Sequence, residues 1–134
     1  MVPAGRVRFA ESTGPLGAAA LAELRRSASI FAAPSAYEPS GLGILAAARD
    51  RCALVLGYIP SLREIWTDAA IFVQPDDARA LHEVLETLIA DRHLRGQLAE
   101  RAQQRASELS IQRTARAYRD LYERLSTTRP AAHA

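Results

Sequence analysis

Apolar and polar positions follow two different periods along this chain. Short continuous apolar runs occupy Ile30–Ala33, Ala53–Gly57 and Ile71–Val73. All three predict strands, and the first two predict buried parallel strands. A short alternating run at residues 7–10 predicts one further strand. Between the runs, apolar residues recur every three or four positions, which predicts helices. Strands that alternate with helices predict an α/β fold with a partial Rossmann-like parallel sheet of about four strands, flanked by helices and followed by a helical C-terminal part.

The helical segments can be placed individually. The pattern predicts a helix over residues 16–27, a second that begins near Gly41, and a short third opened by Pro60 and Ser61. Asp76 or Asp77 is expected to cap the next helix, and two more are expected over residues 93–109 and 111–125. The helix after the aspartates carries a stripe that is expected to face the sheet: Leu81, Val84, Leu85, Leu88 and Ile89.

Length and composition indicate one domain. A chain of 134 residues with 49% hydrophobic content can bury a single core, and we expect one domain over residues 1–126. Residues 127–134, which include Pro130, are expected to form a disordered tail. Cys52 is the single cysteine, so no intramolecular disulfide can form, and its apolar neighbours predict a buried thiol.

The charge pattern argues against a nucleic-acid binder. All 17 basic side chains are arginine, 15 are carboxylates, and the net charge is +2. The two signs intermingle along the C-terminal half, as on solvated helix faces, whereas a nucleic-acid binder concentrates basic residues in one stripe. No apolar run is long enough for a transmembrane segment, and the first ten residues lack the apolar core of a secretory signal, so we expect a cytoplasmic protein. No cofactor and no metal site are predicted.

Candidate binding residues gather in the loops that follow the strands. In a parallel sheet, ligands bind at the carboxyl ends of the strands. This rule places the loop that contains Glu38 beside the loops after the next two strands. The residues expected around that one cleft, besides Glu38, are Tyr58, Ile59, Pro60, Ser61, Gln74 and Asp76.

Residues 37–45 carry a resemblance to a known family. Their sequence, Tyr-Glu-Pro-Ser-Gly-Leu-Gly-Ile-Leu, resembles the Glu-Pro-Phe-Gly-Leu segment of retaining GT-B glycosyltransferases. Further blocks at residues 52–56, 59–66 and 69–77 resemble family blocks in the same order and spacing, and later blocks at 91–95 and 118–122 fit as well. Several ordered blocks are a far stronger signal than one short motif. The resemblance covers residues 7–125 and identifies a C-terminal, donor-binding domain.

The resemblance implies retaining transfer of a sugar from a nucleotide-diphosphate donor without an essential metal. It implies a catalytic role for Glu38 in contact with the donor sugar. Backbone N–H groups at Gly41, Leu42 and Gly43, together with the helix dipole, would stabilise the diphosphate. A solvated loop carboxylate or a helix cap is the alternative for Glu38. The implied binding positions are Pro39, Ser40, Gly41, Leu42, Gly43, Ala46, Tyr58, Pro60 and Ser61.

Several positions depart from the family pattern. Ala46 stands where relatives carry a second glutamate that grips the ribose hydroxyls, and a methyl group cannot accept those hydrogen bonds. Each lost contact is worth roughly 1–3 kcal/mol, or about tenfold to a hundredfold in donor affinity. Ser40 replaces an aromatic residue, Arg51 replaces a glycine, and Tyr58 replaces an aspartate.

The family enzymes also contain parts that are not found before residue 7. These are an acceptor domain and two strand-helix units whose basic residues hold the diphosphate. We therefore expect a truncated donor domain that binds nucleotide sugar weakly and has weak or no activity as an isolated chain. The alternative is a non-catalytic interaction module left by truncation.

The last predicted helix, residues 111–125, carries an apolar stripe with two tyrosines. The stripe predicts self-association or a protein partner. The alternative is that it folds onto the domain's own sheet or a neighbouring helix.

Overall fold

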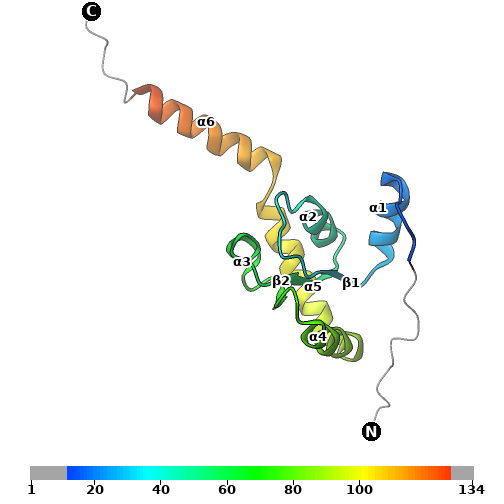
Figure 1. Cartoon of the computed structure of the whole chain (residues 1–134). Helices are drawn as coiled ribbons and strands as arrows, with labels where there is room; N and C mark the ends of the chain where they lie inside the picture. Colours follow the sequence, from blue (N-terminus) through cyan, green and yellow to red (C-terminus); the bar gives the residue numbers. More distant parts are fainter. Residues whose placement is uncertain (1–11, 128–134) are drawn as a thin grey trace, which may run out of the picture.

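The computed structural model describes residues 12–127 and contains the predicted order of helices and strands. Figure 1 shows the elements along the chain. The strand predicted at residues 7–10 and most of the predicted tail lie outside the described residues, and Thr127 ends the last helix. The elements are α1 (Ala18–Ser27), β1 (Ile30–Ala33), α2 (Leu42–Arg49), β2 (Ala53–Gly57), α3 (Pro60–Trp66), β3 (Ile71–Val73), α4 (Ala78–Ala90), α5 (Arg92–Glu108) and α6 (Ile111–Thr127).

The three strands form one parallel sheet in the order β1-β2-β3. The central strand β2 is buried at every position, as its unbroken apolar sequence predicted. Strand β1 is only half-buried, so the prediction of a fully buried strand was wrong there. The reason is its position: among residues 12–127, β1 has a neighbouring strand on one side only.

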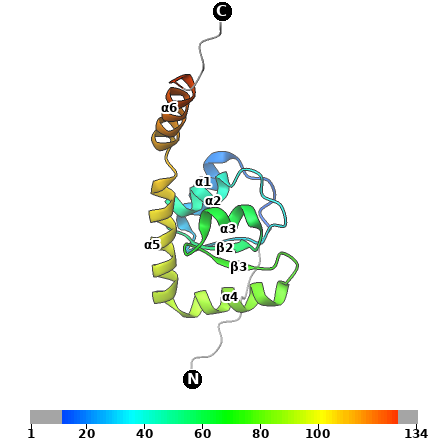
Figure 2. The same cartoon turned by 90° about the vertical axis from the view of Figure 1, so that its left-hand side faces the viewer.

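Successive residues of β2 point to opposite faces of the sheet and serve two cores. Leu54 and Leu56 pack with residues of α2, α3 and α5, including the buried Trp66. Ala53 and Val55 pack with α4, whose Leu88 is completely buried. Figure 2 shows α4 on one face of the sheet, α2 and α3 on the other, and α5 running past the side of both.

Helices α4 and α5 both begin directly after an aspartate cap; Asp77 was expected in this role, whereas the cap at Asp91 was not predicted. The Asp77 carboxylate accepts the Ala80 N–H at 2.8 Å, and the Asp91 carboxylate accepts the Leu94 N–H at 2.9 Å. In α4 the predicted sheet-facing stripe holds except at Ile89, which is 49% exposed. A helix turns about 100° per residue, so once Leu88 faces the sheet, Ile89 is carried away from it.

Helix α6 extends away from the rest of the fold (Figure 1). None of its residues is buried, and Ile111, Tyr118 and Tyr122 are 79%, 57% and 65% exposed. The alternative that this stripe folds onto the domain's own sheet or helices is therefore wrong for the described residues.

Candidate functional site

The loop between β1 and α2 is held by the side chain of Glu38. One carboxylate oxygen, Oε1, accepts the Gly41 N–H at 2.8 Å and the Ser40 N–H at 3.3 Å. Gly41 is the N-cap of α2 and has a φ of +62°, a left-handed conformation that favours glycine. In this structure Glu38 accepts the Gly41 N–H, so that group can meet a phosphate only after Glu38 turns away. Glu38 thus closes the loop before α2, because both of its backbone partners precede the first helical turn.

Part of the predicted site comes together in one small cavity. The cavity has a volume of about 140 Å³, whereas pockets for whole small-molecule ligands measure about 300–1,000 Å³. It therefore has room for only one portion of a nucleotide sugar. Its lining combines the motif loop with the first helical turns of α3 and consists of Glu38, Pro39, Ser40, Gly41, Leu45, Ser61, Leu62, Ile65 and Trp66.

Other predicted site residues lie outside this cavity. Leu42 is 68% exposed, and Gly43 lies beside Phe31 and lines a different cavity, between α1 and β1. Ala46, Tyr58, Pro60, Gln74 and Asp76 do not line it either. The apolar walls from α2 and α3 were missed, although the helical spacing of Leu62, Ile65 and Trp66 could have indicated a shared face with the motif loop.

Tyr58, one of the predicted binding residues, is held by aromatic contacts. The guanidinium carbon of Arg63 lies 4.4 Å from the centre of the Tyr58 ring. Phe72 meets the same ring edge-on at a centroid distance of 6.3 Å. These contacts join α3 to β3 at the carboxyl edge of the sheet, so Tyr58 stabilises the frame around the site.

The motif loop also packs directly on the end of β2. A Cβ atom at Gly57 would lie 2.2 Å from the Ser35 carbonyl oxygen and 3.0 Å from the Ser35 nitrogen. Only glycine permits this approach of two backbones. Because Ser35 starts the loop that leads to Glu38, the contact sets the position of that loop over the sheet.

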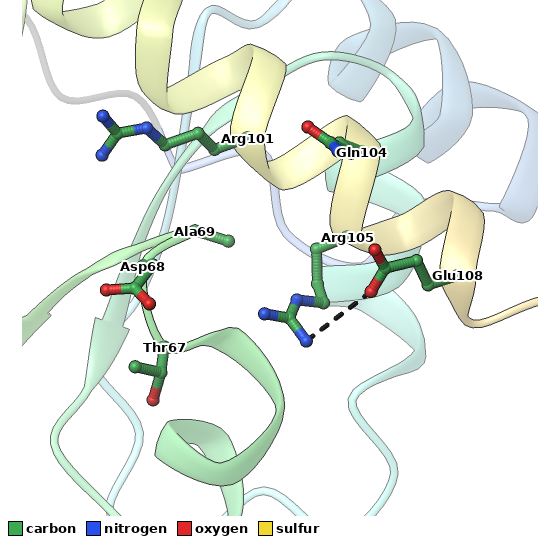
Figure 3. Close-up of a pocket in the computed structure, with 7 residues that line it drawn as sticks. All are labelled: Thr67, Asp68, Ala69, Arg101, Gln104, Arg105 and Glu108. Carbon is green, nitrogen blue, oxygen red and sulfur yellow. Dashed lines mark ion pairs between the residues drawn. The ribbon is translucent and has the colours of Figure 1, made fainter.

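Two features outside this cavity carry nucleophilic or charged groups: the Cys52 thiol and a cavity beside α5. Burial raises the pKa of the Cys52 thiol above its ordinary value, with Asp50 acting in the same direction and Arg25 opposing it, so this thiol is a structural group. A cavity of about 210 Å³ lies between the segment before β3 and α5. Arg105 pairs there with Glu108, and the two side chains are 3.7 Å apart; Figure 3 shows the residues that line this cavity. Its two arginines, Arg101 and Arg105, are matched by two carboxylates, Asp68 and Glu108.

Within residues 12–127, no cluster of three or more His, Cys, Asp or Glu side chains could hold a metal ion. Across the same described part of the chain, no helix has the length and apolar character needed to cross a membrane.

A parallel sheet with helices on both faces defines a Rossmann-like α/β domain, and the Glu38 loop lies at the carboxyl edge of that sheet. The sequence model of the family described as glycosyl transferases group 1 matches residues 11–105. The chain therefore belongs to the group 1 glycosyltransferases, and its domain has a general role in glycosyl transfer. The match includes α1 to β3, α4 and most of α5, and ends before α6. No curated protein matches the sequence.

Proposed function

We propose that this domain binds a nucleotide-diphosphate sugar at the Glu38 loop, as the donor side of a glycosyl transfer. The observation that supports this is the cavity in which Glu38, Ser40, Gly41 and Ser61 come together at the N-terminus of α2. Carboxylate, hydroxyl and backbone groups around a small cavity with apolar walls suit one sugar ring with its hydroxyls.

The start of α2 supplies the complementary chemistry for the diphosphate. The N–H groups of the first turn lack intrahelical acceptors, and the helix dipole places partial positive charge there. Leu42 and Gly43 are the first two residues of that turn. A diphosphate leaving group would be stabilised there as its charge grows. Glu38 would turn from the Gly41 N–H toward a sugar hydroxyl when the donor binds.

Binding should be weak. The cavity holds only one portion of the donor, Ala46 provides no acceptor for ribose hydroxyls, and the Glu38 carboxylate repels phosphate from the N–H groups it occupies. We expect a dissociation constant in the millimolar range, which corresponds to about 4 kcal/mol. Transfer activity of the isolated chain should be correspondingly low or undetectable.

Titration followed by backbone amide NMR tests the proposal. A nucleotide sugar should shift the signals of Ser40, Gly41 and Ser61, and Glu38→Gln should weaken that effect at least threefold. Glu83→Gln is the matched control, because Glu83 lies on α4 and pairs with Arg79. A micromolar dissociation constant would contradict the expected weakness. Equal titration curves for the wild type and Glu38→Gln would contradict the site itself.

The exposed stripe of α6 supports a second candidate function, an interaction module. The helix is about 26 Å long at 1.5 Å per residue, and helices in proteins gain most of their stability from packing of an amphipathic face. The stripe would be covered by a second copy or another protein. It consists of Ile111, Ala115, Tyr118, Leu121, Tyr122 and Leu125.

Light scattering over a range of concentrations tests self-association. The mass should rise with concentration, and Tyr122→Glu should abolish the rise because it places a charge within the stripe. Arg113→Ser, on the polar side of α6, should leave the rise unchanged. A monodisperse monomer at every concentration would exclude a second copy as the partner.

A further inference from the structure

A second cavity, with a volume of about 290 Å³, lies at the amino edge of the sheet. Ser29 and Arg51, which precede β1 and β2, form one side, and the first turns of α5 form the other. The Glu38 loop follows β1 and therefore lies at the opposite edge. The complete lining is Ala28, Ser29, Arg51, Arg92, Arg95, Gly96, Ala99 and Glu100.

This lining is strongly basic. It contains three arginines and one carboxylate, so it carries a net charge of +2. The excess distinguishes it from the cavity of Figure 3, where arginines and carboxylates are equal in number.

Each arginine retains capacity to bind an anion. Nη1 of Arg95 donates to the Leu88 and Ile89 carbonyls at 2.6 and 3.1 Å, which fixes the guanidinium while its other nitrogens bond to no residue between 12 and 127. The Arg92 side chain makes no hydrogen bond or ion pair within the same described residues. Arg51 has only a long 3.9 Å contact with Glu100, and both side chains are mostly exposed.

The backbone at Arg51 is in a conformation that arginine disfavours. Its φ is +64°, in the left-handed region where a side chain with a Cβ is strained. Glycine would adopt this conformation without strain. The sequence nevertheless places a cation here, and the surrounding protein gives that cation only the weak contact with Glu100.

We propose that this arginine cavity binds a phosphate group carrying two negative charges, from a soluble phosphate compound or a lipid headgroup. Planar guanidinium groups donate pairs of hydrogen bonds that match phosphate oxygens, and the net charge of the lining equals that of the dianion. The N-terminus of α5 is not the source of the site, because the Asp91 carboxylate already accepts the Leu94 N–H there at 2.9 Å. When the anion binds, it would replace Glu100 as the partner of the Arg51 guanidinium.

The test is a titration of the full chain with inorganic phosphate and pyrophosphate at constant ionic strength, followed by the Arg92 and Gly96 amide signals. Saturable binding is expected, and Arg92→Gln and Arg51→Gly should each weaken it about tenfold, as expected for loss of about 1.4 kcal/mol of a charge-assisted contact. Arg51→Gly should keep or raise the melting temperature, since it relieves the backbone, so its loss of binding cannot result from unfolding.

Two controls separate this site from others. Arg101→Gln changes an exposed arginine on the same helix outside the cavity and should bind as the wild type does. Glu38→Gln should leave the Arg92 and Gly96 titrations unchanged, so that failure of the nucleotide-sugar proposal and failure of this one remain distinct. Equal binding by the wild type, Arg92→Gln and Arg51→Gly, or no saturation, would overturn the proposal.

A second experiment, with lipid vesicles, identifies whether the phosphate belongs to a lipid headgroup or to a soluble compound. Flotation with vesicles of phosphatidic acid in phosphatidylcholine, compared with phosphatidylcholine alone, tests the headgroup. Arginine-dependent flotation supports a lipid headgroup, and arginine-dependent pyrophosphate binding without flotation supports a soluble compound.

Discussion

The contact between Gly57 and Ser35 predicts a large effect of Gly57→Ala. A Cβ built at Gly57 lies 2.2 Å from the Ser35 carbonyl oxygen, more than one ångström short of an ordinary contact of 3.4 Å or longer. The obstructing atoms belong to the backbone, so no side-chain rotation relieves the overlap. Either the end of β2 or the loop at Ser35 must move.

The expected cost follows from this overlap. Overpacking costs typically 1–3 kcal/mol, and a rigid backbone obstacle belongs at the upper end, about 3 kcal/mol. Alanine also reduces the conformational entropy of the unfolded chain, which stabilises the folded state by roughly 0.4–1 kcal/mol. Gly57→Ala should therefore lower the free energy of unfolding by about 2 kcal/mol, or about 1 M in urea midpoint at a slope near 2 kcal/mol/M.

Urea unfolding followed by Trp66 fluorescence measures this change, because Trp66 is buried in the core that β2 forms with α2, α3 and α5. Gly96→Ala is the matched control: a Cβ at Gly96 in α5 meets nothing within 4 Å, and alanine should stabilise that helix by roughly 0.5–1 kcal/mol. If Gly57→Ala were as stable as the wild type, the argument for a fixed loop position would be refuted. The amide signals of Ser40 and Gly41 should also shift in Gly57→Ala, because the displaced loop leads to them.

Two further predictions concern the core. Trp66→Ala should lower the free energy of unfolding by about 3–5 kcal/mol in urea denaturation followed by circular dichroism, because Trp66 is 2% exposed; a loss below about 1 kcal/mol would contradict the packing of α3 on β2. Burial raises the pKa of Cys52 above 9.0, so the folded thiol holds its proton more tightly than the unfolded one. Its stabilising contribution should be constant below about pH 9 and be lost as the pH rises further, and Cys52→Ala should show less decline above that pH than the wild type.

The periodic pattern predicted the described helices and strands because each element has an apolar face or run matched to its own period. The pattern could not predict the half-buried state of β1, since burial of an edge strand depends on its neighbours in space. It also left open whether the stripe of α6 is covered, because amphipathicity is the same for a helix that packs on its own domain and for one that extends from it.

The candidate site was predictable only in part for a related reason. The rule for parallel sheets correctly placed the Glu38 loop at the carboxyl edge, but it could not say which neighbouring loops contribute side chains to one cavity. Ser61 does and Tyr58 does not, because Tyr58 packs against Arg63 and Phe72. The arginine cavity was invisible in the sequence, since Arg51 and Arg92 are far apart along the chain.

The charges at the two proposed phosphate sites, the Glu38 loop and the arginine cavity, predict which ligand each site prefers. At the start of α2, the Glu38 carboxylate occupies the Gly41 N–H and repels phosphate, whereas the arginine cavity carries an excess of +2. Pyrophosphate should therefore bind first at the amino edge, and a sugar group is needed to direct a nucleotide sugar to the Glu38 loop.

The variant Glu38→Gln separates these preferences. It removes the repelling charge and replaces the charged acceptor for sugar hydroxyls with a weaker, neutral amide oxygen, so pyrophosphate should perturb Ser40 and Gly41 more strongly than in the wild type. A nucleotide sugar should perturb the same amides less. Amide NMR titrations with both ligands measure the two effects in one sample series. If Glu38→Gln changed both titrations in the same direction, the sugar-binding role of Glu38 would be wrong, because charge alone would then account for its effect.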